Sequence, residues 1–257
     1  MPLLPFSSQA ENSQAKLAVL IDADNTQPAI IEGLLDEVAK YGVASVKRIY
    51  GDWTSVHLRS WKERLLANAI QPIQQFSYTT GKNSTDSAMI IDAMDLLYSE
   101  KLDGFCIVSS DSDFTRLAAR LRESGCTVYG FGEEKTPKAF VKVCDKFIYT
   151  EIILENQEES EEEGQPRAKG RKEFKADRKL LKLLRDAVDD IADESGWANL
   201  AGVGQKINNR SSEFDPRNYG FKKLGDLFRA VPQFETEERQ QEHSAGRQVY
   251  IRWKRKR

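Results

Sequence analysis

The sequence predicts an α/β fold: a mostly parallel, Rossmannoid sheet with helices on both faces, plus a small winged helix-turn-helix domain. Short apolar runs alternate with amphipathic segments through the first part of the chain, and a second amphipathic pattern begins near residue 177. Strands that alternate with helices of this length are typical of parallel sheets with crossover helices. The 257 residues suffice for one sizeable domain and a smaller one.

The first domain is expected to alternate strands and helices from end to end. Gly42 and Gly125 follow predicted helices, where a glycine is favoured. Pro28 opens another helix, at a position that tolerates proline. The expected strands are 17–21, 43–51, 70–78, 104–110, 126–132 and 147–153. The expected helices are 28–41, 55–69, 84–99, 113–124 and 137–143.

An acidic run from Glu155 to Glu163 separates the two patterns, and a basic stretch follows it directly. A charge block of this kind cannot bury a core, so it predicts a solvated linker. We therefore expect a first domain at residues 15–153, a charged linker at 154–174 and a second domain at 175–253.

The net charge of −2 conceals an asymmetry between the two parts of the chain. Residues 165–257 hold 22 Lys+Arg and 14 Asp+Glu, a net of +8, which leaves −10 for residues 1–164. A basic domain behind an acidic one suggests a module that binds a polyanion beside a site that holds metal.

Membrane and disulfide chemistry are not expected. Cys106, Cys126 and Cys144 lie in or near apolar segments without CxxC spacing, which favours core packing over disulfides or zinc. No long apolar stretch is present, and the N-terminus lacks the basic start and apolar core of a signal peptide. We expect a soluble cytoplasmic protein.

Three short acidic clusters carry the functional signal: Ile21–Asn25, Lys82–Asp86 and Ser109–Phe114. The first and third follow apolar runs that predict buried strands, so their carboxylates are expected at strand C-terminal ends, where open α/β sheets build their sites. Carboxylates that converge there repel one another unless a cation lies between them. Hard divalent cations such as Mg²⁺ or Mn²⁺ take oxygen ligands of this kind.

Within the first two clusters, Asp22 is the expected primary ligand, with Asp24 two residues further on. Asn25 suits either a ligand-orienting role or an ordinary turn. Asp86, in the first turn of a helix, would alone be explained as a partner of the helix dipole, but the other clusters favour a metal ligand. Lys82 would steady a phosphate charge or remain a solvated lysine.

The third cluster exceeds what a helix cap requires. Ser109 and Ser110 end a predicted strand, and Asp111 and Asp113 stand at the start of a helix. Backbone N–H groups at a helix start can hold a phosphate or orient a carboxylate. We expect both aspartates to bind the metal and both serines to support them or the substrate.

The second domain is expected to contain three helices and a terminal β-ribbon, a winged helix-turn-helix. Lysine and arginine side chains there would neutralise the phosphates of a nucleic acid, and a tyrosine would stack on an exposed base. A solvated helix face is the alternative explanation for each basic residue. The candidate contacts are Lys206, Arg210, Arg217, Tyr219, Lys222, Lys223 and Arg229.

Both halves of the chain resemble known families. The three acidic clusters in this order, with the stretch Gly104–Gly132, resemble the NYN domain, a LabA-like branch of the PIN-like nuclease superfamily. The segment Trp197–Phe228, which includes PRNYGFKKLGDLF, resembles the OST-HTH or LOTUS domain. The first resemblance implies an acidic metal site at Asp22, Asp86, Asp111 and Asp113. The second implies RNA binding and a protein partner.

We therefore expect a metal-dependent ribonuclease, and an endoribonuclease in particular, whose basic domain delivers RNA; a homodimer is also compatible with the sequence. One alternative is an RNA-binding or adaptor protein without catalysis. Another is a haloacid-dehalogenase-like phosphatase, because LAVLIDADNT fits a D-x-D-x-T motif with Asp22 as nucleophile and Asp24 as acid. The Lys82–Asp86 loop and the basic module fit a nuclease better.

Overall fold

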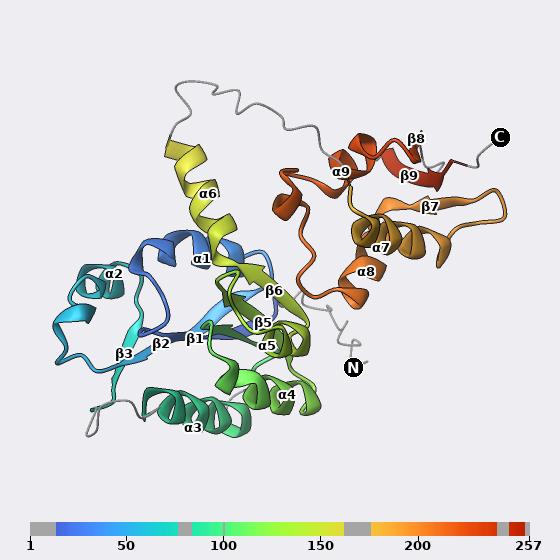
Figure 1. The fold of residues 1–257 in the computed structure, drawn as a ribbon. Coiled ribbons are helices and arrows are strands. Elements are labelled where there is room, and N and C mark those ends of the chain that lie inside the picture. Colours follow the sequence, from blue (N-terminus) through green and yellow to red (C-terminus); the bar gives the residue numbers. More distant parts are fainter. Residues whose placement is uncertain (1–13, 77–83, 100, 162–175, 241–246, 255–257) are drawn as a thin grey trace, which may run out of the picture.

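The computed structural model describes residues 14–76, 84–99, 101–161, 176–240 and 247–254. Its first domain is built on a six-stranded sheet in the order β3-β2-β1-β4-β5-β6, and every pair of neighbouring strands is parallel (Figure 1). The strands are β1 Lys16–Asp22, β2 Val43–Gly51, β3 Gln71–Gln74, β4 Gly104–Val108, β5 Thr127–Gly132 and β6 Lys146–Tyr149.

Helices cover both faces of this sheet, so its central strands are buried and almost wholly apolar (Figure 1). One face packs against α1, α2 and α6, and the other against α3, α4 and α5. The helices are α1 Ile31–Val38, α2 Trp61–Ala67, α3 Ser84–Ser99, α4 Thr115–Glu123, α5 Lys138–Val143 and α6 Thr150–Glu161. The predicted fold class is confirmed.

The centre of the sheet positions the acidic segments. Strand β1 pairs with β2 on one side and with β4 on the other, so the chain changes direction across the sheet at this point. The register sets Ile21 opposite Val108, which places Asp22, the last residue of β1, beside Ser109, the residue after β4. Open α/β sheets bind their ligands at such a switch point.

The second domain combines three helices with a three-stranded antiparallel sheet in the order β7-β9-β8. Its core is formed mainly by apolar side chains of the helices, with Phe234 and Ile251 from the strands. This is the expected winged-helix arrangement. The elements are α7 Arg178–Asp189, β7 Trp197–Asn199, α8 Leu200–Arg210, α9 Leu224–Ala230, β8 Phe234–Gln240 and β9 Arg247–Trp253.

The last predicted strand of the first domain is shorter than the sequence suggested. Strand β6 ends at Tyr149 and helix α6 starts at the next residue, so residues 150–153 are helical. Ile153 is buried against α1, which anchors this helix on the sheet. The helix continues to Glu161, so the first part of the expected linker, residues 154–161, is also helical.

The two domains are in contact along the edge strand β6. The Phe147 N–H donates to the Ser212 carbonyl at 2.8 Å, and the Ser212 hydroxyl donates to the Val141 carbonyl at 2.7 Å. A loop of the second domain therefore covers a strand edge that would otherwise present unpaired backbone groups. Within the described residues, no helix is both long and apolar enough to cross a membrane.

Candidate functional site

Asp22 is a buried carboxylate held from three directions. It is 1% exposed at the end of β1. One oxygen accepts the Asn25 amide at 2.7 Å and the Ser109 hydroxyl at 2.8 Å, and the other accepts the Asp24 N–H at 3.1 Å. Burial raises the pKa of Asp22 above its usual value, although these hydrogen bonds act in the opposite direction. These hydrogen bonds thus hold the side chain of Asp22 in a fixed position at the site.

Three further carboxylates lie close together near Asp22. Asp86, Asp111 and Asp113 each offer an oxygen, and these oxygens all lie within 4.8 Å of one another. Asp86 comes from the first turn of α3, whereas Asp111 precedes the short 3-10 turn Ser112–Phe114 after β4 and Asp113 lies within it. Asp111 caps that turn by accepting the Asp113 N–H at 2.9 Å. The three side chains thus belong to two separate segments that meet only in the folded chain.

The electrostatics of Asp86 show that the carboxylates interact. Partial burial first, and then the negative charges of Asp22, Asp111 and Asp113, raise the pKa of Asp86 to about 6. A cluster that disfavours its own negative charge gains stability when a cation binds. Hard divalent cations prefer oxygen donors, and the three groups that converge here are all carboxylates, so these residues fit Mg²⁺ or Mn²⁺.

The supporting residues have distinct places. Exposed Asp24 accepts a 3.3 Å hydrogen bond from the hydroxyl of Thr85, which ties the loop after β1 to the start of α3. Ser109 also accepts the Asp111 N–H at 3.1 Å, and Ser110 accepts the Glu133 N–H at 2.9 Å. These bonds link the loops after the central strands, whereas Lys82 lies outside the described residues.

The predicted nucleic-acid contacts of the second domain differ in their surroundings. Arg210 pairs with Asp186 and Asp190, and Arg229 pairs with Asp226 and Glu238. Lys206 is half-buried in α8, whereas Lys222 and Lys223 are exposed just before α9. Tyr219 is half-buried against Phe214, with 5.9 Å between the ring centroids.

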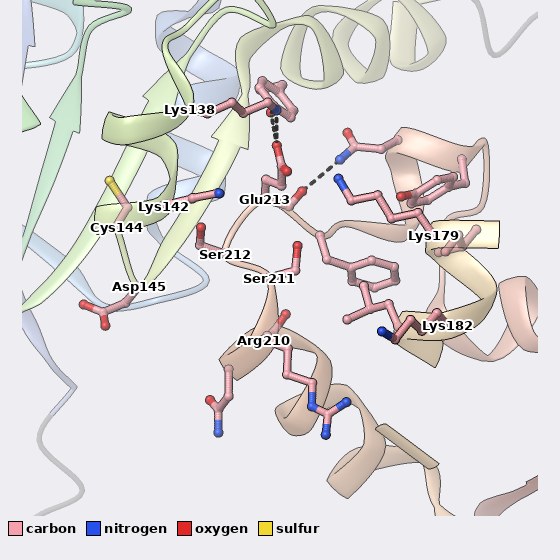
Figure 2. Close-up of a pocket in the computed structure, with 18 of the residues that line it drawn as sticks. Lys138, Lys142, Cys144, Asp145, Lys179, Lys182, Arg210, Ser211, Ser212 and Glu213 are labelled. Carbon is pink, nitrogen blue, oxygen red and sulfur yellow. Dashed lines mark hydrogen bonds and ion pairs between the residues drawn. The ribbon is translucent and has the colours of Figure 1, made fainter. Parts of the chain in front are cut away.

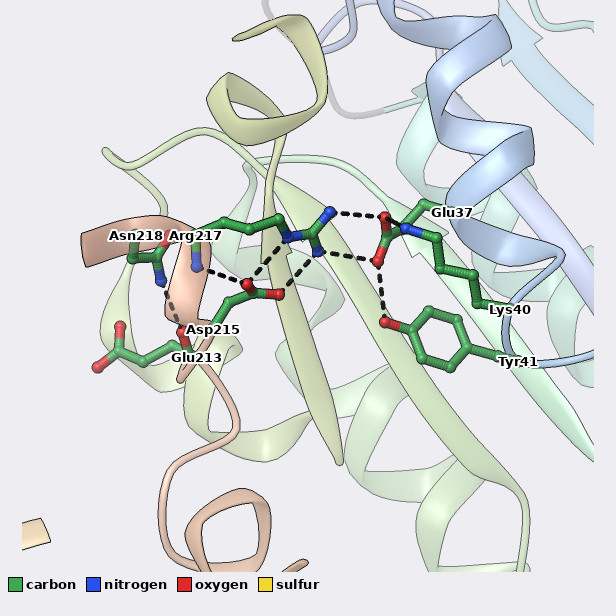
Figure 3. Close-up of polar contacts among 7 residues, drawn as sticks. All are labelled: Glu37, Lys40, Tyr41, Glu213, Asp215, Arg217 and Asn218. Carbon is green, nitrogen blue, oxygen red and sulfur yellow. Dashed lines mark hydrogen bonds and ion pairs between the residues drawn. The ribbon is translucent and has the colours of Figure 1, made fainter. Parts of the chain in front are cut away.

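Arg217 differs most from the sequence-based expectation, because it contacts the first domain (Figure 3). Its guanidinium donates two 2.9 Å hydrogen bonds to the carboxylate of Glu37 in α1, and it also bonds Asp215 at 2.7 and 2.9 Å. Glu37 further accepts from Lys40 at 2.5 Å and from the Tyr41 hydroxyl at 3.1 Å. Arg217 is therefore engaged in the contact between the domains.

Sequence reasoning missed this contact because a lone Glu37 in an amphipathic helix has the pattern of an ordinary solvated charge. The side chain of Glu37 is nevertheless only 5% exposed. Its charge is maintained by hydrogen bonds from Arg217 and Lys40, which outweigh the effect of burial and lower its pKa to about 2. No local signal in the sequence distinguishes it from its exposed neighbours.

The fold and the acidic cluster together define the class of protein: a PIN-like α/β domain joined to a winged-helix module. The NYN domain model matches residues 16–154, more than half of the chain, and the OST-HTH/LOTUS domain model matches residues 174–244. The chain therefore belongs to the NYN domain family and carries an OST-HTH/LOTUS domain after it. Both resemblances inferred from the sequence are confirmed, and the family supports a nuclease with an RNA-binding module.

Solved structures provide partial likenesses. A protein of unknown function from Vibrio parahaemolyticus is 16% identical, with a TM-score of 0.45, over 53% of this chain and 93% of its own. An uncharacterized protein from Nitrosomonas europaea is 37% identical, with a TM-score of 0.31, over 37% of this chain and 89% of its own. No curated protein sequence matches the chain.

Proposed function

We propose that the protein is a metal-dependent ribonuclease, specifically an endoribonuclease, that hydrolyses RNA phosphodiesters at the cluster of Asp86, Asp111 and Asp113. The observation that carries this proposal is the convergence of their three oxygens within 4.8 Å. Carboxylates gathered in this way can hold a divalent cation, and without that cation they would repel the anionic substrate. The attached OST-HTH/LOTUS domain supports RNA as the substrate.

In this proposal each residue has a defined task. Asp86, Asp111 and Asp113 would hold Mg²⁺ or Mn²⁺, and Asp22 would fix the loops behind them through its bonds to Asn25 and Ser109. When bound, such a cation polarises a phosphodiester and lowers the pKa of a water molecule to that of an effective nucleophile.

The buried position of Asp22 argues against the phosphatase alternative. A phosphatase of that class needs an accessible carboxylate as the nucleophile. Asp22 is 1% exposed, and both of its oxygens accept hydrogen bonds. The nuclease assignment instead uses Asp22 as a positioning residue.

Cleavage of end-labelled RNA by wild type and by Asp111→Asn, with Mg²⁺, Mn²⁺ or EDTA, tests the proposal. Asparagine also caps helical turns, so the variant keeps the local fold while it removes the charge. Asp95→Asn, an exposed position on the same helix as Asp86, is the matched control. Metal-dependent cleavage lost only in Asp111→Asn is expected.

If the protein binds RNA tightly but leaves it intact under every metal condition, the nuclease proposal is refuted and the RNA-binding or adaptor alternative is supported. Cleavage of a circular RNA, which has no ends for an exonuclease, would identify an endonuclease. A cytoplasmic location, a protein partner for the second domain and a homodimer stay separate predictions. The size of the protein in solution tests the last of these.

A further inference from the structure

A groove of 1240 Å³ lies between the two domains, with walls from α5 of the first domain and α7 of the second (Figure 2). None of the carboxylates assigned to the acidic site lines it. Its volume exceeds the roughly 300–1,000 Å³ that is typical of pockets for single small ligands. The groove therefore has room for several linked units of a polymer.

Each wall presents two lysines along one helix face. Lys138 and Lys142 are four residues apart in α5, and Lys179 and Lys182 are three residues apart in α7, spacings that put side chains on the same face. Figure 2 shows the two pairs on opposite sides of the groove, and all four lysines are exposed. The groove is therefore flanked by positive charge from both domains.

The acidic side chains of the groove are mostly engaged already. Three of them form ion pairs with other lining residues: Asp145 with Arg122, Glu213 with Lys138, and Asp186 with Arg210. Asp177 caps α7 by accepting the Leu180 N–H at 2.6 Å but keeps its charge, so within the described part of the chain Asp177 and Glu134 are the two lining carboxylates without an ion pair to another lining residue. By contrast, no carboxylate of the described residues forms an ion pair with Lys142, Lys179 or Lys182. The balance of unneutralised charge in the groove is positive.

The contact between the domains fixes the two walls relative to each other. Arg217 bonds Glu37 across the interface, and the Ser212 carbonyl accepts the Phe147 N–H. A groove held in this way is formed before its ligand arrives, which lowers the entropic cost of binding.

The loop after β5 connects the groove to the segment that carries Asp111. Glu134 lines the groove, and its neighbour Glu133 donates its N–H to the hydroxyl of Ser110, the residue before Asp111. The opposite wall includes Tyr219, an aromatic side chain of the kind on which unpaired bases stack. Positive walls, an aromatic ring and this continuity match a nucleic-acid strand that runs toward the carboxylates.

We propose that the groove between the domains binds a single strand of RNA, with its phosphates paired to Lys142, Lys179 and Lys182 and a base stacked on Tyr219. The proposal rests on the proposed function, because it names the path by which RNA reaches the acidic site. It also assigns RNA contacts to the first domain, on α5, where no sequence pattern predicts them.

Binding of a short fluorescein-labelled single-stranded RNA, measured by anisotropy in EDTA over a series of salt concentrations, tests the groove without any cleavage. The variant is Lys142→Gln with Lys182→Gln. Each lost phosphate contact lowers the slope of log affinity against log salt by about 0.7 on a single strand, so the double variant should lose about 1.4. Its affinity at physiological salt should fall about tenfold.

The matched control replaces two exposed lysines outside the groove, Lys62 and Lys101, by glutamine in one variant. The control should bind as wild type does. Equal affinity and slope for the groove variant and wild type would overturn the proposal. Equal competition by an RNA duplex would overturn the single-strand assignment, and displacement by polyglutamate would overturn the choice of nucleic acid over an acidic protein.

These results separate the groove from the nuclease. If binding depends on the groove lysines but no metal condition gives cleavage, the nuclease proposal is refuted and RNA binding in the groove is supported. If cleavage depends on metal but substitution of Lys142 and Lys182 leaves RNA affinity unchanged, the nuclease proposal is supported and RNA binding in the groove is refuted.

Discussion

The ion pair between Glu37 and Arg217 stabilises the contact between the two domains, and its contribution to the free energy of that contact can be tested. Glu37→Gln keeps the size of the side chain and removes the charge that Arg217 contacts with two 2.9 Å hydrogen bonds. Arg217 keeps its bonds to Asp215, so the substitution acts mainly on the part of the contact that crosses between the domains. It should therefore favour separation of the domains over unfolding of either one.

The magnitude follows from the pKa of Glu37, which falls from 4.5 to about 2 in the folded chain. At about 1.36 kcal/mol for each pH unit, the difference corresponds to roughly 3 kcal/mol. Lys40 contributes part of it from within the first domain and is 58% exposed. We therefore assign about 2 kcal/mol to the contact with Arg217.

The pH dependence has a definite sign. Because the folded-state pKa of Glu37 lies below the unfolded value, its contribution is complete above about pH 4.5 and is lost as the pH falls toward 2. Wild type should lose this stabilisation in that range. Glu37→Gln should lack it at every pH.

Hydrogen exchange of the Phe147 amide, followed by NMR, reports on the contact because this N–H donates to Ser212 of the other domain at 2.8 Å. A loss of about 2 kcal/mol should accelerate its exchange about 30-fold in Glu37→Gln at neutral pH. Glu32→Gln is the control, since Glu32 lies on the same helix and pairs with Arg64 inside the first domain. An unchanged Phe147 exchange rate would refute the reasoning.

Three further predictions concern the first domain. Asp86→Asn should raise the unfolding free energy in EDTA at pH 7 by about 1 kcal/mol, because burial and nearby carboxylates raise the pKa of Asp86 to about 6. This gain should vanish below about pH 4, and urea titrations at both pH values measure it. Asp92→Ala should cost about 2–3 kcal/mol in the same assay, because it leaves the buried hydroxyl of Tyr50 without its acceptor. Gly132→Ala should cost about 1–3 kcal/mol and reduce RNA cleavage, because the new Cβ would lie 2.7 Å from the Ser109 carbonyl oxygen; unchanged melting and cleavage would contradict this packing argument.

Local sequence patterns are sufficient to predict part of this architecture. The apolar run that becomes β1 is buried on both sides, and such runs alternating with amphipathic helices are sufficient to predict a parallel sheet. Helix α3 begins and ends at the predicted residues, Ser84 and Ser99. Strand-end positions likewise predict that Asp22 and Asp111 lie near each other, because parallel strands present their carboxyl ends at one edge.

The tertiary structure decided what each charge does. Sequence alone predicts Asp22 as the primary metal ligand; the fold buries it with its oxygens already hydrogen-bonded and brings oxygens of Asp86, Asp111 and Asp113 within 4.8 Å of one another. Sequence alone also made Arg217 an RNA contact, whereas the docked domains place it against Glu37. Periodicity and turn signals are local, so they determine elements and faces. The partner of a charge depends on which distant segments pack together, and only the folded chain specifies that.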